Sequence, residues 1–155
     1  MGHNIGMRLM NSALQTALAH ALDEIQTQST NIPPEVRGRL TGLLLDQWFN
    51  DTDRPRTTTM RRQLLRTLRE LQPEDAAFLT AAQRERLHFE LRRQSNDPIL
   101  LPAIVEALGR IGDHDALPLL RPLSDGKGAA VDCLSLQQAA QASVRQLEAA
   151  LRANQ

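Results

Sequence analysis

Residues 97–123 constrain the fold more than any other part of the chain, because two short amphipathic segments follow one another there. In the first segment the apolar residues recur at helical spacing and share one face: Leu101, Ile104, Val105, Leu108 and Ile111. Gly112 suits the end of that helix, and Asp113 can cap the next one. The second segment has its own apolar face, made by Ala116, Leu117, Leu119, Leu120 and Leu123. Two such helices cannot bury both faces alone, so we expect similar helices beside them.

The composition favours helices along the whole chain. Leu, Ala, Gln, Arg and Glu dominate, and these residues are good helix formers. Aromatic residues make up 3% of the 155 residues and Tyr is absent, whereas sheet proteins usually depend on aromatic and β-branched residues. This length corresponds to one ordinary domain. We therefore predict a single all-α domain over residues 1–155, with residues 1–6 disordered.

The hydrophobic pattern predicts about seven helices. They cover approximately residues 7–26, 33–50, 60–71, 73–94, 97–111, 115–123 and 134–151. In the fourth, a capping box that starts at Thr80 leaves a break near that residue open. Pro102 lies inside the fifth helix and predicts a kink in its first turns, and Pro118 and Pro122 limit the length of the sixth.

A comparison of the sequence with itself indicates an internal repeat. At a shift of about forty residues, apolar residues of the third helix lie over those of the fifth. Leu64, Leu65, Leu68, Leu71, Ala76 and Leu79 align in this way with Ile104, Val105, Leu108, Ile111, Ala116 and Leu119. A third, partial copy covers residues 136–147. Periods of this size are typical of stacked helical hairpins.

The run from Ala107 to Asp113, followed by the run from Asp115 to Leu120, resembles a bacterial HEAT repeat of the phycobilisome-lyase type. The resemblance is good over 97–125 and weaker over 57–82 and 132–151. It implies a bacterial α-solenoid, a right-handed superhelix of about three and a half degenerate HEAT-like hairpins. Such repeats often place a Val-Arg pair early in the second helix of each hairpin, and here only Met60-Arg61 fits. The family includes scaffolds, enzyme partners and chromophore-attachment factors, so the resemblance implies architecture more than function.

Charge is balanced overall but unevenly distributed. The 18 basic and 18 acidic residues cancel, while residues 54–93 hold ten arginines against five acidic residues. Arg62, Arg66 and Arg69 follow one another along the polar face of the third predicted helix. Such a row can bind phosphates or an acidic partner surface. The other interpretation is a solvated face in which Arg66 pairs with Glu70.

The leading hypothesis is a non-enzymatic scaffold or adaptor that binds a protein partner, with an acidic surface, through the concave face of the repeat array. In stacked hairpins the second helix of each pair lines that face, which here selects the first, third, fifth and seventh helices. The candidate partner-binding residues are Arg62, Arg66, Arg69, Glu106, Arg110, Gln141, Arg145 and Glu148. Two alternatives stay open: a nucleic-acid-associated repeat protein that uses the Arg-rich stretch 54–69, and a subunit of a HEAT-like lyase.

No catalytic, cofactor or metal site is predicted. His88 has no second His or Cys at metal-ligand spacing, and Cys133 has no basic neighbour that would activate its thiol. His114 is a turn residue, and Lys127 lacks the rest of a phosphate-binding loop. Trp48 is expected in the core. The chain shows neither a signal-peptide pattern nor an apolar run that could span a bilayer, so we expect a cytoplasmic protein that does not bind membranes.

Overall fold

A computed structural model of the chain describes residues 17, 20, 32–49, 58–93 and 97–154. Of the helix predicted over 7–26, this part includes Ala17 and His20, and both are helical. The rest of that helix and the disorder predicted for residues 1–6 lie outside the described residues.

The described residues form α-helices and short 3-10 helices and contain no strand, which confirms the all-α prediction for this part of the chain. The α-helices are α2 (Pro34–Phe49), α3 (Thr58–Glu70), α4 (Ala81–Arg92), α5 (Leu100–Arg110), α6 (Leu117–Ser124) and α7 (Leu134–Ala153). The 3-10 helices are η1 (Pro73–Phe78), η2 (His114–Ala116) and η3 (Gly128–Ala130).

The break predicted near Thr80 is confirmed, because η1 ends before this residue and α4 begins after it. The Thr80 hydroxyl accepts a hydrogen bond from the backbone N–H of Gln83 at 3.1 Å, and the Gln83 side-chain oxygen accepts one from the backbone N–H of Thr80 at 3.0 Å. This reciprocal capping box satisfies two backbone donors that the first turn of a helix leaves without partners.

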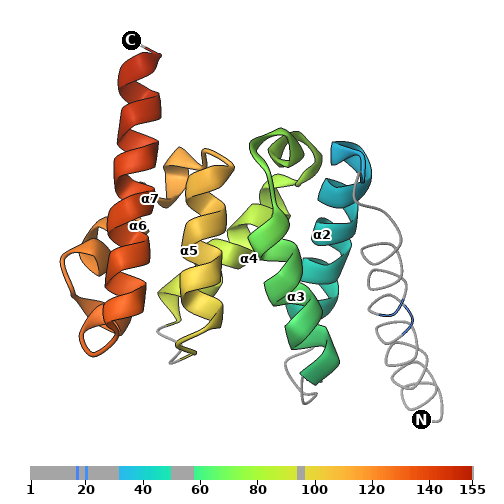
Figure 1. Ribbon diagram of the computed structural model, residues 1–155, viewed down its shortest axis with the longest axis horizontal. Helices are drawn as coiled ribbons and strands as arrows, with labels where there is room; N and C mark the ends of the chain where they lie inside the picture. Colours follow the sequence, from blue (N-terminus) through green and yellow to red (C-terminus); the bar gives the residue numbers. More distant parts are fainter. Residues whose placement is uncertain (1–16, 18–19, 21–31, 50–57, 94–96, 155) are drawn as a thin grey trace.

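The helices form two rows that lie against each other (Figure 1). In one row α3, α5 and α7 lie side by side and run in the same direction, with α5 in contact with both others. In the other row α4 contacts α2 and α6. Across the rows, α2 packs on α3, α4 on α5 and α6 on α7. The helix α5 therefore has neighbours from both rows, and it forms the centre of the described fold.

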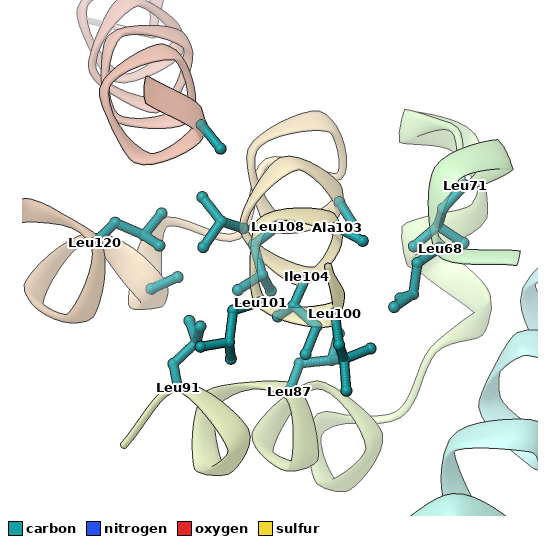
Figure 2. Packing of buried hydrophobic residues seen from close by; sticks show 14 of the residues in the cluster. Leu68, Leu71, Leu87, Leu91, Leu100, Leu101, Ala103, Ile104, Leu108 and Leu120 are labelled. Atoms are coloured by element: carbon teal, nitrogen blue, oxygen red, sulfur yellow. The ribbon is translucent and has the colours of Figure 1, made fainter. Parts of the chain in front are cut away.

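The core is built around α5, as Figure 2 shows. Ile104 and Leu108 are completely buried there, and Ile111 at the end of the helix is 8% exposed. Leucines from the surrounding helices point toward them: Leu68 and Leu71 near the end of α3, Leu87 and Leu91 of α4, and Leu120 of α6. The apolar positions of α3 that the repeat aligns with α5 are buried as well.

The two helices predicted from residues 97–123 are present, with differences in detail. Both α5 and α6 make their closest backbone contacts with α7 rather than with each other. Because α5 begins at Leu100, Pro102 lies in its first turn, where a missing N–H does not break a helical hydrogen bond. Pro102 is therefore not expected to kink α5. Pro122, in contrast, lies inside α6.

The contact between α5 and α7 depends on a small side chain in each helix. A Cβ atom at Gly109 would lie 2.6 Å from the Oγ of Ser143, so only glycine allows this approach. The Ser143 hydroxyl donates a hydrogen bond to the Val105 carbonyl at 2.9 Å. The apolar pattern that predicts α7 includes Leu134 and Leu151, but these residues lie near the ends of the helix and are 66% and 39% exposed.

The apolar face of α2 differs from the prediction. Val36 and Leu43 belong to the helical pattern from which this helix is predicted, but they are 40% and 49% exposed, while Leu45 is completely buried. The helix turns Leu44 and Leu45 toward the core, and Trp48, as predicted, is buried at 3% exposure. Because α2 carries apolar residues on more than one side, periodicity alone does not identify the side that packs.

Basic side chains of one helix hold carboxylates at the connections of the next. Two N–H groups of Arg37 in α2 donate to Asp75 in η1 at 2.5 and 3.0 Å, and the Asp75 side chain is completely buried. Arg61 in α3 donates in the same two-pronged manner to Asp97, ahead of α5, at 3.2 and 2.8 Å. Burial opposes ionisation of Asp97, but the hydrogen bonds from Arg61 and from the backbone at the start of α5 lower its pKa.

Replacing Leu108 by Ala tests the central position of α5. We expect the free energy of unfolding to fall by about 2–5 kcal/mol, because the change opens a cavity in a fully packed site. The same substitution at the exposed Leu134 is the control and should change it by less than about 0.5 kcal/mol. Urea unfolding of the three proteins measures both values. A loss below about 1 kcal/mol for Leu108→Ala would contradict the packing described here.

Candidate functional site

Three arginines of α3 surround a hollow of about 260 Å³ on the outer side of this helix. The helix buries Met60, Leu64 and Leu68, so residues on the opposite side point away from the core. The residues that line the hollow, called here the α3 arginine hollow, are Arg62, Leu65, Arg66, Arg69 and Glu70. The row of arginines predicted from sequence therefore lies around a single concave site.

The α3 arginine hollow carries a net positive charge. Arg66 pairs with Glu70 at 3.5 Å, as the i,i+4 spacing predicted. Arg62 and Arg69 are exposed and form no ion pair with any residue in the described ranges. Leu65 contributes an apolar side chain that is 8% exposed. Arginine presents its donors in a planar fork that matches a carboxylate or a phosphate, so the hollow suits an anionic group.

Arg110, a candidate for partner binding, is half-buried and makes a structural contact. From α5 its guanidinium reaches the end of α3, where its Nε–H donates to the Leu71 carbonyl at 3.0 Å and a second N–H donates to the Leu68 carbonyl. The last carbonyls of a helix have no partner within the helix, so these bonds cap α3. Burial lowers the pKa of Arg110, and the Glu106 carboxylate opposes this effect.

The other four candidates do not line the α3 arginine hollow. Glu106 is exposed on α5, and Arg145 is exposed on α7. Gln141 donates to the Ser124 carbonyl at the end of α6 at 3.2 Å, and Glu148 lies 3.6 Å from Arg121 of α6. These two side chains therefore help to join α7 to α6. Because α5 lies between α3 and α7, the structure does not bring the α7 candidates together with those of α3 (Figure 1).

A pair of arginine substitutions separates the structural contact from an exposed charge. Arg110→Gln should lower the free energy of unfolding by about 1–3 kcal/mol, because it leaves carbonyls of α3 without their charged donor. Arg145→Gln is the matched control and should leave this value within about 0.5 kcal/mol of wild type. Chemical denaturation at one salt concentration compares them. Equal stability of the two variants would show that the Arg110 contacts do not hold α3.

His88 lies between two carboxylates in the described structure, an arrangement that its sequence neighbourhood does not indicate. Its Nε2 is 2.6 Å from Asp113 at the start of η2, and its Nδ1 is 3.2 Å from Glu85 one turn earlier in α4. His88 and Asp113 are both buried, and Glu85 also pairs with Arg92. Each ring nitrogen thus meets an acceptor, which only the doubly protonated imidazolium satisfies fully. The hydrogen bond to Asp113 raises the pKa of His88 above 6.5, although burial opposes the shift.

The raised pKa of His88 predicts how stability changes with pH. The folded protein holds this proton more tightly than the unfolded chain does, so the pair stabilises the fold fully below about pH 6.5. That contribution is lost as pH rises through the higher pKa of the folded state. His88→Gln should therefore destabilise the protein more at about pH 6 than at about pH 9. Urea unfolding at both pH values checks this, and an equal effect at the two values would contradict it.

Cys133 was also considered from sequence, and it lies beside a hollow of about 360 Å³ between the start of α5 and the start of α7. Cys133 is half-buried, with its Sγ 3.3 Å from the Ser135 hydroxyl. Among the residues that the structure describes, no group of three or more His, Cys, Asp or Glu side chains is placed to hold a metal ion. None of the helices in the described ranges is both long enough and apolar enough to cross a membrane. The cytoplasmic location stays a prediction.

A second hollow, of about 470 Å³, was not predicted from sequence. It lies between α2 and the segment that joins η1 to α4, and Leu43, Phe78 and Leu79 are among the apolar residues that line it, together with Arg39. Its position depends on contacts between segments about forty residues apart. The sequence signal that could have indicated it is the pair Gly38 and Gly42, one turn apart on the side of α2 that meets these segments.

Comparisons with known proteins identify no relative. The chain matches no family model, no curated protein and no solved structure. The fold alone defines the class of protein: the described residues form two rows of packed α-helices. The resemblance to HEAT repeats stays a prediction, and function must be inferred from the side chains described above.

Proposed function

We propose that this protein is a non-enzymatic helical-repeat adaptor that binds an acidic protein surface through the α3 arginine hollow. We further propose that the two rows of helices are HEAT-like hairpins of an α-solenoid. The observation that carries the proposal is the pair Arg62 and Arg69, which stand exposed around one hollow without an ion pair to a described residue.

The contrast with other arginines supports this proposal. Arg37 and Arg61 bind carboxylates at helix connections, and Arg110 binds backbone carbonyls, so each of these contributes to the fold. Arg62 and Arg69 make no comparable contact to a described residue, and the like charges of the row repel one another by a few tenths of a kcal/mol. The contacts to described residues therefore give no stability reason for Arg62 and Arg69, whereas an anionic partner does.

The apolar part of the hollow favours a protein partner over nucleic acid. Leu65 lies among the arginines, and the residues that line the hollow include no aromatic side chain on which a base could stack. Carboxylates on a partner can pair with Arg62 and Arg69 while an aliphatic group covers Leu65. Arginine is enriched in the energetically important parts of protein interfaces, which agrees with this arrangement.

Replacing Arg62, Arg66 and Arg69 together by Gln tests the proposal. The probes are a dye-labelled Glu-rich peptide and a single-stranded oligothymidine of equal charge, followed by fluorescence anisotropy. We expect wild type to bind the peptide and the triple variant to bind it about tenfold more weakly, from roughly 0.5 kcal/mol for each lost charge pair. The triple variant should be as stable as wild type or slightly more stable, because the charge repulsion is relieved.

A second triple variant controls for net charge. Arg92, Arg121 and Arg152 are exposed on three other helices, and their joint replacement by Gln removes the same charge without touching the hollow. The variant also removes the exposed ion pairs of Arg92 with Glu85 and of Arg121 with Glu148, and pairs as exposed as these contribute little to stability. This control should keep the affinity for the peptide within about twofold. If the α3 variant binds the peptide as wild type does, the proposal fails, and a concave-face site would have to use Gln141, Arg145 and Glu148. If wild type binds the oligothymidine more tightly than the peptide, and this affinity falls steeply as the salt concentration rises, the nucleic-acid alternative replaces the adaptor proposal.

A further inference from the structure

The turn that joins α5 to α6 is tied to α4 by the buried contact between Asp113 and His88. Gly112 gives the turn its positive φ of 73°, and the backbone N–H of Asp113 donates to the Leu108 carbonyl at 3.1 Å, which closes the end of α5. The Asp113 carboxylate then lies 2.6 Å from the Nε2 of His88, and both side chains are at most 7% exposed. The place of the turn against α4 therefore depends on one imidazole–carboxylate pair.

The same carboxylate has a second role available in the helix that follows it. Asp113 is the N-cap residue of η2, where aspartate usually accepts a hydrogen bond from the backbone N–H two or three residues later. The sequence predicts such a cap, but the side chain makes no capping bond and is turned to His88. The Ala116 N–H already donates to the Asp113 backbone carbonyl at 3.2 Å, so the Asp115 N–H would serve the cap. One carboxylate thus has two alternative partners.

The charge on His88 decides between these partners. The doubly protonated ring donates to Asp113 through Nε2 and to Glu85 through Nδ1, at 2.6 and 3.2 Å. A neutral imidazole has one N–H, so a lone pair then faces one of the two carboxylates. Glu85 is 54% exposed and is also bound by Arg92, so it can leave the ring without disturbing the fold. Loss of the proton therefore releases Glu85 and replaces the ion pair at Asp113 by a weaker hydrogen bond.

The charged groups on the elements around α4 have other partners or face solvent. The ion pairs among them are Asp46 with Arg86, Glu90 with Arg93 and Arg121 with Glu148. Arg110 of α5 binds carbonyls of α3, while Glu106 of α5 and Asp115 of η2 are exposed. His114, the other titratable group of the turn, is half-buried. Asp113 and Glu85 are the charged groups that raise the pKa of His88, so its proton reports on them.

We infer that His88 and Asp113 form a proton-controlled clasp between α4 and the turn that leads into α6. With His88 charged, the clasp is closed and η2 has no side-chain cap, as the structure shows. With His88 neutral, the turn opens more often, and in the open form the Asp113 carboxylate caps η2 through the Asp115 N–H. This device concerns the turn and the start of α6, and it does not depend on the α3 arginine hollow.

Amide hydrogen exchange of the turn tests the inference on the wild-type protein. The Ala116 and Leu117 N–H groups both donate within the turn, to the carbonyls of Asp113 and His114. Their rates are measured at about pH 6 and about pH 9, and each is divided by the rate of an unstructured peptide at the same pH. We expect their protection to fall about fivefold between the two values, because the bond to Asp113 loses its charged donor. It should be lower than that of the α5 amides at both values, since the turn opens locally.

Substitutions of the two turn histidines assign the effect. His88→Gln removes the titrating ring, so the protection of Ala116 and Leu117 should be equal at the two pH values. His114→Gln is the matched control and should keep the fivefold change. Asp113→Asn loses the ion pair and keeps a side chain that caps well, so its turn should be protected at about pH 6 as the wild-type turn is at about pH 9.

The cap has a signature of its own. In nitrogen-15 spectra of the wild type, the Asp115 amide resonance should move with the same midpoint pH as the His88 ring, because this N–H gains its acceptor when the ring loses its proton. A resonance that does not follow the ring would overturn the inference.

Two further results would also overturn it. If Ala116 and Leu117 are protected as strongly as Ile104 and Leu108, the turn opens only when the whole protein unfolds. If the fivefold change persists in His88→Gln, or disappears in His114→Gln, another group controls the turn. Should His88→Gln fail to fold, the wild-type titration and Asp113→Asn decide the question without it.

Discussion

The burial of α5 on several sides is the constraint on which the rest of the described fold depends. Leu100, Ile104 and Leu108 are at most 1% exposed, and they face helices of both rows. Each helix that contacts α5 packs one of its sides against it, and the opposite side of that helix therefore faces away from the core. The outward direction of the α3 arginines is thus a consequence of the packing of Leu64 and Leu68.

Ionic and polar hydrogen bonds at the helix ends fix how the helices and their connections are placed where apolar packing alone does not. Arg61 ties α3 to Asp97, Arg110 caps α3 from α5, and His88 ties α4 to the turn after α5. These bonds give carboxylates and carbonyls in the connections a charged donor, and charged hydrogen bonds of this kind are directional. The same comparison distinguishes arginines that build the fold from Arg62 and Arg69, which form no ion pair with a residue that the structure describes.

Much of the fold could be predicted from sequence, because the helices around α5 have one dominant apolar side and clear end signals. The capping box at Thr80 and the Gly112 turn gave boundaries that the structure contains. The packed side of α2 could not be predicted, since Leu43 and Leu45 are equally apolar and their burial depends on how α2 packs against η1, α3 and α4. Local sequence identified the α3 row, but its only signal for the hollow beside η1 is the pair Gly38 and Gly42, because this hollow joins segments about forty residues apart.

Amide hydrogen exchange under native conditions tests the central position of α5 most directly. If the described packing is correct, the amides from Ile104 to Leu108 exchange only through global unfolding, with a free energy equal to that from urea denaturation. Amides in the first turns of α2, which has an exposed side, should exchange through local opening at a lower free energy. Exchange of α5 at a free energy below that of α2 would contradict a fold organised around α5.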